Sequence, residues 1–123
     1  MKVGIVGGGQ LARMLALAGY TLGMQFQVID PAADACAGQV AELIQGDYAD
    51  EVLLAQLAAW ADVATFDFEN VPAAAAAILE QQTVVYPPAE ALAVAQDRLA
   101  EKTLFWELGI PTPTFATVDS LAE

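Results

Sequence analysis

Short apolar runs alternate with longer stretches of helical periodicity along the first 88 residues. Such short runs predict buried strands, and apolar positions that recur every three or four residues predict helices. The expected strands cover residues 3–6, 26–30, 40–44, 62–68 and 83–86, and the expected helices cover 9–22, 51–60 and 72–82. Strands separated by helices of this length predict an α/β fold with a doubly wound parallel sheet.

The expected helices carry recognisable boundary residues. Asp50 is a typical N-cap, Pro72 suits a first helical position, and Gly23 suits a helix end. In the first helix the periodicity places a set of apolar residues on one face, namely Leu11, Met14, Leu15, Ala18 and Leu22.

The pattern changes after Pro88. Two helical stretches follow, the second being DRLAEKTLFWELG with Asp97 as its expected cap. PTPTF then predicts a short extended segment, and VDSLAE predicts the first turn of a further helix. We therefore expect one domain over residues 1–95, followed over residues 96–123 by a linking helix and the first elements of a second domain.

Composition narrows the range of possible functions. Hydrophobic residues make up 57% of the 123 residues, and 16 acidic against four basic residues give a net charge of −12. Such a chain is expected to fold, and its acidic surface disfavours nucleic acid and anionic membranes as partners. No apolar run approaches the roughly 18 residues of a membrane helix, and no signal-peptide pattern precedes the first strand. We expect a cytoplasmic protein.

The histidine and cysteine content argues against a zinc site and a disulfide. The chain has no histidine, and its single cysteine is Cys36. A zinc site is therefore not expected, and an internal disulfide is excluded.

A glycine-rich turn links the first strand to the first helix. Residues 7–12, GGGQLA, fit the pattern GxGxxA, in which glycines let backbone amides approach an anion at a helix N-terminus. Asp30 ends the second strand, where an acidic residue would hold a ribose hydroxyl. The turn is thus compatible with a dinucleotide, with a phosphate, or with close helix–strand packing alone.

Two further segments carry candidate chemistry. In TFDFENVP, Asp67 and Glu69 are expected on one face at the carboxyl end of the fourth strand, where parallel sheets collect ligands. In QDRLAEK, Arg98 and Lys102 are expected on one helix face. Arg98 suits a polyphosphate, although a surface helix with ion pairs to Asp97 and Glu101 would account for these cations equally.

Five segments in this order and spacing resemble the N-terminal region of the carboxyaminoimidazole ribonucleotide synthase family, within the ATP-grasp superfamily. They span essentially the whole chain: GGGQLARM, VIDP, QVAELIQGDYAD, TFDFENVP and QDRLAEKTLFWELGIPTP. Gln10 separates the chain from the related formate-dependent glycinamide ribonucleotide transformylases, which carry glutamate there. The chain departs from the family's usual glycine, tyrosine and glutamate at Ala12, Phe66 and Asp67.

The resemblance implies a site and a reaction. Aminoimidazole ribonucleotide would bind at the glycine turn, and Arg98 would contact ATP. The implied substrate-binding residues are Gly8, Gly9, Gln10, Leu11 and Glu69. Family members use ATP, magnesium and bicarbonate to carboxylate the substrate's exocyclic amine, and they are commonly homodimers. The family's glycine-rich lid and acidic metal ligands are missing from these 123 residues. We therefore expect no catalytic residue and no metal ligand here, and no activity from this chain alone.

Other functions stay open at this point. They are a free-standing NAD-binding Rossmann module, a related ATP-grasp enzyme such as glycinamide ribonucleotide transformylase, and a non-catalytic interaction domain. The stretch 96–115 favours a ligase, because a dinucleotide-binding module has no need of a cationic helix that leads into PTPTF.

Overall fold

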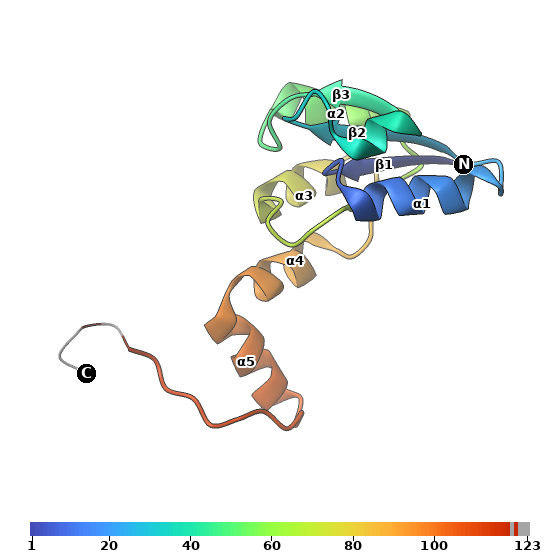
Figure 1. The fold of residues 1–123 in the computed structure, drawn as a ribbon. Helices are drawn as coiled ribbons and strands as arrows, with labels where there is room; N and C mark the ends of the chain where they lie inside the picture. Colours follow the sequence, from blue (N-terminus) through green and yellow to red (C-terminus); the bar gives the residue numbers. More distant parts are fainter. Residues whose placement is uncertain (119, 121–123) are drawn as a thin grey trace.

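Five parallel strands form one sheet in the computed structural model, which describes residues 1–118 and 120. The order across the sheet is β3-β2-β1-β4-β5 (Figure 1). The strands are β1 (Lys2–Val6), β2 (Gln25–Asp30), β3 (Glu42–Gln45), β4 (Val63–Phe66) and β5 (Val84–Val85). The expected doubly wound α/β sheet is confirmed, and its order reverses between β1 and β4. Ligands of such sheets bind at the carboxyl ends of the strands beside that reversal.

Helices cover both faces of the sheet. The α-helices are α1 (Gln10–Tyr20), α2 (Glu51–Trp60), α3 (Ala73–Glu80), α4 (Ala89–Gln96) and α5 (Arg98–Glu107), and η1 (Cys36–Gln39) is a short 3₁₀ helix. Buried residues of α2, α3 and α4 form one apolar core with the sheet, while α1 and η1 form a second core on the opposite face. The sheet therefore separates two cores, as its alternating side chains require.

The helix boundaries follow local chemistry. The Asp50 side chain accepts hydrogen bonds from the amides of Val52 and Leu53, which confirms it as the N-cap of α2. Asp97 caps α5 in the same way. Pro72 is the residue before α3 rather than its first helical residue. The fourth strand was expected over residues 62–68, but β4 begins at Val63 and ends at Phe66. Asp67 and Glu69 thus lie beyond the strand.

The buried side of α1 is made of small residues. Ala12, Ala16 and Gly19 face the sheet, and a Cβ at Gly19 would stand 2.4 Å from the Phe26 ring. The larger apolar residues of this helix share a face as expected, but that face is exposed to solvent. Small residues allow a helix to approach a sheet closely, so they take the inner positions here.

α5 follows α4 and extends away from the sheet (Figure 1). None of the α5 residues is buried. Residues 110–118, which include PTPTF, form no helix or strand. Most of the helix expected over 118–123 lies outside the described residues.

Candidate functional site

The glycine turn between β1 and α1 brings the backbone close to two carboxylates. Gly7 has φ +101°, a conformation that favours glycine, and a Cβ at this position would stand 2.7 Å from the Cβ of Asp67. At Gly9, a Cβ would stand 2.3 Å from Asp67 Oδ2. The absence of side chains is therefore what allows Asp67 to reach this turn.

Asp67, the residue that follows β4, caps the N-terminus of α1. Its Oδ2 accepts from the Gly9 amide at 2.7 Å, and its Oδ1 accepts from the Ala12 amide at 2.6 Å. The amide of Asp67 itself donates to the carbonyl of Val6, so the backbone is held in register with β1. A carboxylate at this position also interacts favourably with the helix dipole. Both carboxylate oxygens of Asp67 are thus used in hydrogen bonds within the fold.

Asp30 is the buried carboxylate of the site. It accepts from the Gly8 amide at 2.8 Å, from the Tyr48 hydroxyl at 2.8 Å and from the Ala32 amide at 2.8 Å. These three donors and the burial of Asp30 leave at most one acceptor site, on Oδ1, for a ribose hydroxyl, so Asp30 is poorly placed for the dinucleotide role. Tyr48 was not singled out from the sequence, because nothing in GDYAD indicates that its hydroxyl reaches Asp30.

The two carboxylates leave a specific part of the turn for a ligand. Gly8 and Gly9 donate their amides to Asp30 and Asp67. Within the described part of the chain, the amides of Gln10 and Leu11 have no partner, since they lie in the first turn of α1. Gln10 is exposed. The backbone groups of this turn that can donate a hydrogen bond to a ligand are therefore the amides of Gln10 and Leu11.

Glu69 lies on the loop after β4, beside a hollow of about 290 Å³. Asp67 and Glu69 line this hollow on one side, and α4 lines it on the other through Ala91, Leu92 and Ala95. Gln96, at the end of α4, donates from Nε2 to the carbonyls of Glu69 and Val71, both at 2.5 Å. The side-chain amide of Gln96 thus holds the loop that carries Glu69 in place. This role could not be predicted from the position of Gln96 in the sequence.

Arg98 begins α5 as an exposed side chain that pairs with Glu101. Lys102 points elsewhere: its Nζ donates to Thr112 Oγ1 at 3.1 Å and lies 5.3 Å from the centre of the Phe115 ring. The ion pair considered from the sequence is therefore present, and the two cations have different partners. Such an exposed pair contributes little to stability, so it leaves Arg98 available to a stronger anion.

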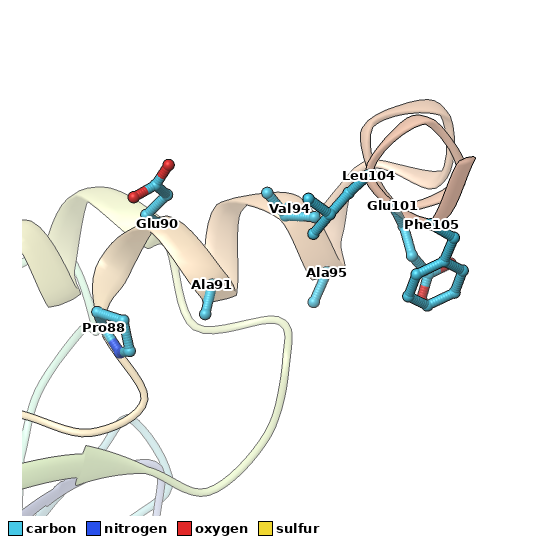
Figure 2. A pocket seen from close by; sticks show the side chains of 8 residues that line it. All are labelled: Pro88, Glu90, Ala91, Val94, Ala95, Glu101, Leu104 and Phe105. Carbon is cyan, nitrogen blue, oxygen red and sulfur yellow. The ribbon is translucent and has the colours of Figure 1, made fainter. Parts of the chain in front are cut away.

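A larger groove of about 480 Å³ runs between α4 and α5. Figure 2 shows Val94 of α4 with Leu104 and Phe105 of α5 among its side chains. The charged residues on its wall are Glu90 and Glu101. Apolar walls with carboxylates do not suit a phosphate, and this groove is better suited to apolar side chains.

Two searches of the described residues, one for clusters of metal-binding side chains and one for membrane-spanning helices, found none. Over residues 1–118 and 120, no group of three or more His, Cys, Asp or Glu side chains could hold a metal ion. In the same residues, no helix combines the length and apolar character needed to cross a membrane.

The Tyr48 hydroxyl provides a test of the carboxylate network. Burial, the hydrogen bond to Asp30 and the charges of Asp30, Asp67 and Asp47 raise the pKa of Tyr48 to about 12. An unfolded tyrosine ionises near pH 10. The native state holds its proton to higher pH, so stabilisation from Tyr48 is complete below about pH 10 and is lost as pH rises through about 12. Phenolate absorbance of the wild type minus that of Tyr48→Phe should show a midpoint near 12; a midpoint near 10 would contradict the network.

A doubly wound parallel sheet with a glycine turn at its order reversal defines a Rossmann-like, ligand-binding α/β domain. The chain belongs to the ribonucleotide synthetase pre-ATP-grasp domain family, whose model matches residues 1–96.

The relatives of the chain are considerably longer enzymes. It is 56% identical over 123 residues to N5-carboxyaminoimidazole ribonucleotide synthase of Pseudomonas aeruginosa, an alignment that covers 100% of this chain and 34% of that protein. The corresponding protein of Brucella melitensis is 46% identical over 95% of this chain and 33% of its own length. The chain therefore spans about a third of the length of these curated relatives and corresponds to their N-terminal portion.

Solved structures agree with these matches. The crystal structure of N5-carboxyaminoimidazole ribonucleotide synthetase from Thermus thermophilus gives a TM-score of 0.94 at 56% identity, over 98% of this chain and 33% of that one. The Aspergillus clavatus enzyme, in complex with ADP and 5-aminoimidazole ribonucleotide, gives a TM-score of 0.81 at 31% identity, over 89% of this chain and 30% of that one.

Proposed function

We propose that this chain is the substrate-side N-terminal domain of an ATP-dependent carbon–nitrogen ligase of de novo purine biosynthesis. The parent enzyme carboxylates aminoimidazole ribonucleotide with bicarbonate in the cytoplasm. The observation that carries the proposal is the 56% identity to a carboxyaminoimidazole ribonucleotide synthase along the whole chain. A structural relative has been solved with ADP and aminoimidazole ribonucleotide, which supports the same ligands here. The engaged Asp30 disfavours the NAD-binding alternative.

The substrate would bind at the carboxyl edge of β1 and β4. The free amides of Gln10 and Leu11 and the Gln10 side chain offer donors to a nucleotide, while Glu69 offers an acceptor beside the hollow. Gly8 and Gly9 contribute by being small, since their backbone forms the floor of the turn. These five residues form the proposed substrate-binding set.

ATP would be held between this chain and the remaining domains of the parent enzyme. Arg98 is exposed and, among residues 1–118 and 120, pairs with Glu101 alone, so it could meet phosphate oxygens when those domains close over the nucleotide. Magnesium, bound with the triphosphate, would neutralise charge during phosphoryl transfer. The ligands for that magnesium would come from the other domains.

The boundary of this domain is proposed at residue 95, with residues 96–123 leading into the ATP-grasp domain. The absence of buried residues in α5 supports this division. The apolar groove between α4 and α5 would then receive side chains of the domain that follows. We also propose that the parent enzyme is a homodimer.

The proposal predicts binding without turnover for residues 1–123. Titration calorimetry of this chain should detect aminoimidazole ribonucleotide and no NAD, and Gln10→Ala should weaken the substrate signal. ATP hydrolysis dependent on substrate and bicarbonate should stay at background with this chain and appear with the full-length enzyme. Binding of NAD in preference to the ribonucleotide, or turnover by this chain alone, would contradict the proposal.

A further inference from the structure

The loop between β4 and α3 carries Glu69 with little support of its own. It begins at Asp67, whose carboxylate is bonded to amides of α1 and its turn, and it ends near Val71, which is fully buried. The backbone hydrogen bond found inside this loop joins the Val71 amide to the Phe68 carbonyl at 3.5 Å. A bond of that length is weak, so the placement of Glu69 depends on a contact from outside the loop.

Gln96 supplies that contact from the end of α4. Its Nε2 donates to the Glu69 carbonyl and to the Val71 carbonyl, both at 2.5 Å. A side-chain amide carries two donor hydrogens, which matches these two acceptors. The acceptors lie 27 and 25 residues before Gln96 in the sequence. The bonds therefore join the loop to α4, the two segments that line the hollow of about 290 Å³.

The fold of the domain does not require these two bonds. Gln96 and Glu69 are both exposed, and water can replace a hydrogen bond in an exposed position at little net cost. Val71 is held by its buried side chain, which belongs to the core formed with α2, α3 and α4. What Gln96 determines is therefore the course of the loop between its two ends, where Glu69 lies.

Charge makes this support important. Asp67 and Glu69 both line the hollow, so two carboxylates share one small space. Asp67 is held by the Gly9 and Ala12 amides, whereas the Glu69 side chain forms no hydrogen bond or ion pair within residues 1–118 and 120. Like charges repel, so a loop without support would carry Glu69 away from the hollow.

We propose that Gln96 is a positioning residue for the ribonucleotide: by binding the carbonyls of Glu69 and Val71, it keeps the Glu69 carboxylate beside the hollow. The inference rests on the proposed function, because that function assigns Glu69 to the substrate. The next two residues have other roles, since Asp97 caps α5 and Arg98 is proposed to meet ATP. Loss of the Gln96 amide should therefore affect the ribonucleotide and spare ATP.

The test is the steady-state kinetics of the full-length enzyme, with each substrate varied separately. Gln96→Met keeps the length of the side chain and removes both donors. It should raise the KM for aminoimidazole ribonucleotide about tenfold, because Glu69 loses a charge-assisted contact with the substrate. The kcat and the KM for ATP should stay nearly unchanged. Partial unfolding would instead lower kcat through the fraction of active enzyme, so this split separates positioning from a loss of fold.

Two further variants make the result specific. Gln96→Glu keeps the shape of the side chain, but its ionised carboxylate offers no donor to the two carbonyls, so it should raise the same KM at least as much. Gln45→Met is a matched control: Gln45 also donates from Nε2 to a loop carbonyl, that of Pro31 at 3.2 Å, but it ends the edge strand β3. This control should leave both KM values unchanged. An equal rise of KM in Gln45→Met would overturn the inference.

A double-mutant cycle tests whether Gln96 acts through Glu69. Glu69→Ala should raise the KM for the ribonucleotide at least as much as Gln96→Met. Adding Gln96→Met to Glu69→Ala should raise it no further, because no carboxylate is left to be positioned. Independent effects that multiply would overturn the inference, as would an unchanged KM in folded Gln96→Met.

The outcomes also separate this inference from the proposed function. An unchanged KM in Glu69→Ala would remove Glu69 from the substrate-binding set and overturn the inference, while the carboxylation reaction would stand. A full-length enzyme without turnover dependent on aminoimidazole ribonucleotide would overturn the proposed function itself, and the inference with it.

Discussion

Asp67→Ala should lower the free energy of unfolding of this chain by about 2–4 kcal/mol, because two charge-assisted hydrogen bonds at the start of α1 are lost. Some of the loss is recovered when water reaches the freed amides of Gly9 and Ala12. Asp67→Asn should also destabilise the chain, since its amide group offers one acceptor oxygen where the carboxylate uses two. Urea unfolding, followed by circular dichroism, measures these differences.

A second helix cap provides the control for Asp67. Asp50 accepts hydrogen bonds from two amides of α2, but it is exposed and local in sequence. Asp50→Ala should cost about 1 kcal/mol, the usual effect of removing an N-cap. Equal destabilisation by Asp50→Ala and Asp67→Ala would show that Asp67 acts as an ordinary cap and does not join β4 to α1.

Arg98→Ala should raise the KM for ATP severalfold or more in the full-length enzyme. A guanidinium bonded to phosphate oxygens is charge-assisted and often bidentate, so its loss weakens nucleotide binding directly. Arg98→Lys should rescue the KM in part, because an ammonium group has no planar fork. The KM for aminoimidazole ribonucleotide should move much less, since that ligand is proposed to bind at the glycine turn. Steady-state kinetics with each substrate varied separately gives both constants.

Glu101→Gln separates the two roles of Arg98. This variant removes the ion pair and leaves the guanidinium in place. If Arg98 only pairs with Glu101, both substitutions should cost about 0–1 kcal/mol of stability and neither should change the KM for ATP. If Arg98 binds ATP, Arg98→Ala alone should raise that KM. An unchanged KM for ATP in Arg98→Ala would show that Arg98 only forms a surface ion pair.

Because the Gly8 and Gly9 amides already donate to carboxylates, a substitution at Gly8 would not test ligand binding alone. A bulky residue there would block an anion, but its Cβ would also stand 2.9 Å from the Cβ of Ala35 and 3.0 Å from that of Asp30. Gly8→Val would therefore disturb the fold as well as any ligand. Gln10, which is exposed, is the better position at which to test substrate binding.

The order of strands and helices was predictable from the sequence because apolar periodicity is a local property. The parallel sheet and the caps Asp50 and Asp97 followed from patterns a few residues long. The end of β4 did not follow, because the apolar run continues to Phe68 while Asp67 turns toward α1. The direction of that side chain depends on amides 55 and 58 residues away in sequence.

Residues close together along the chain were enough to establish the α/β class, the glycine turn and the family resemblance. Which groups remain available to a ligand depended on packing between distant segments. That packing placed the Asp30 and Asp67 carboxylates on the Gly8 and Gly9 amides, and it turned the small side of α1 inward. Periodicity shows that residues share a face, but the direction of that face depends on how closely helix and sheet approach. At α1 that distance is short, because Ala12, Ala16 and Gly19 have little or no side chain.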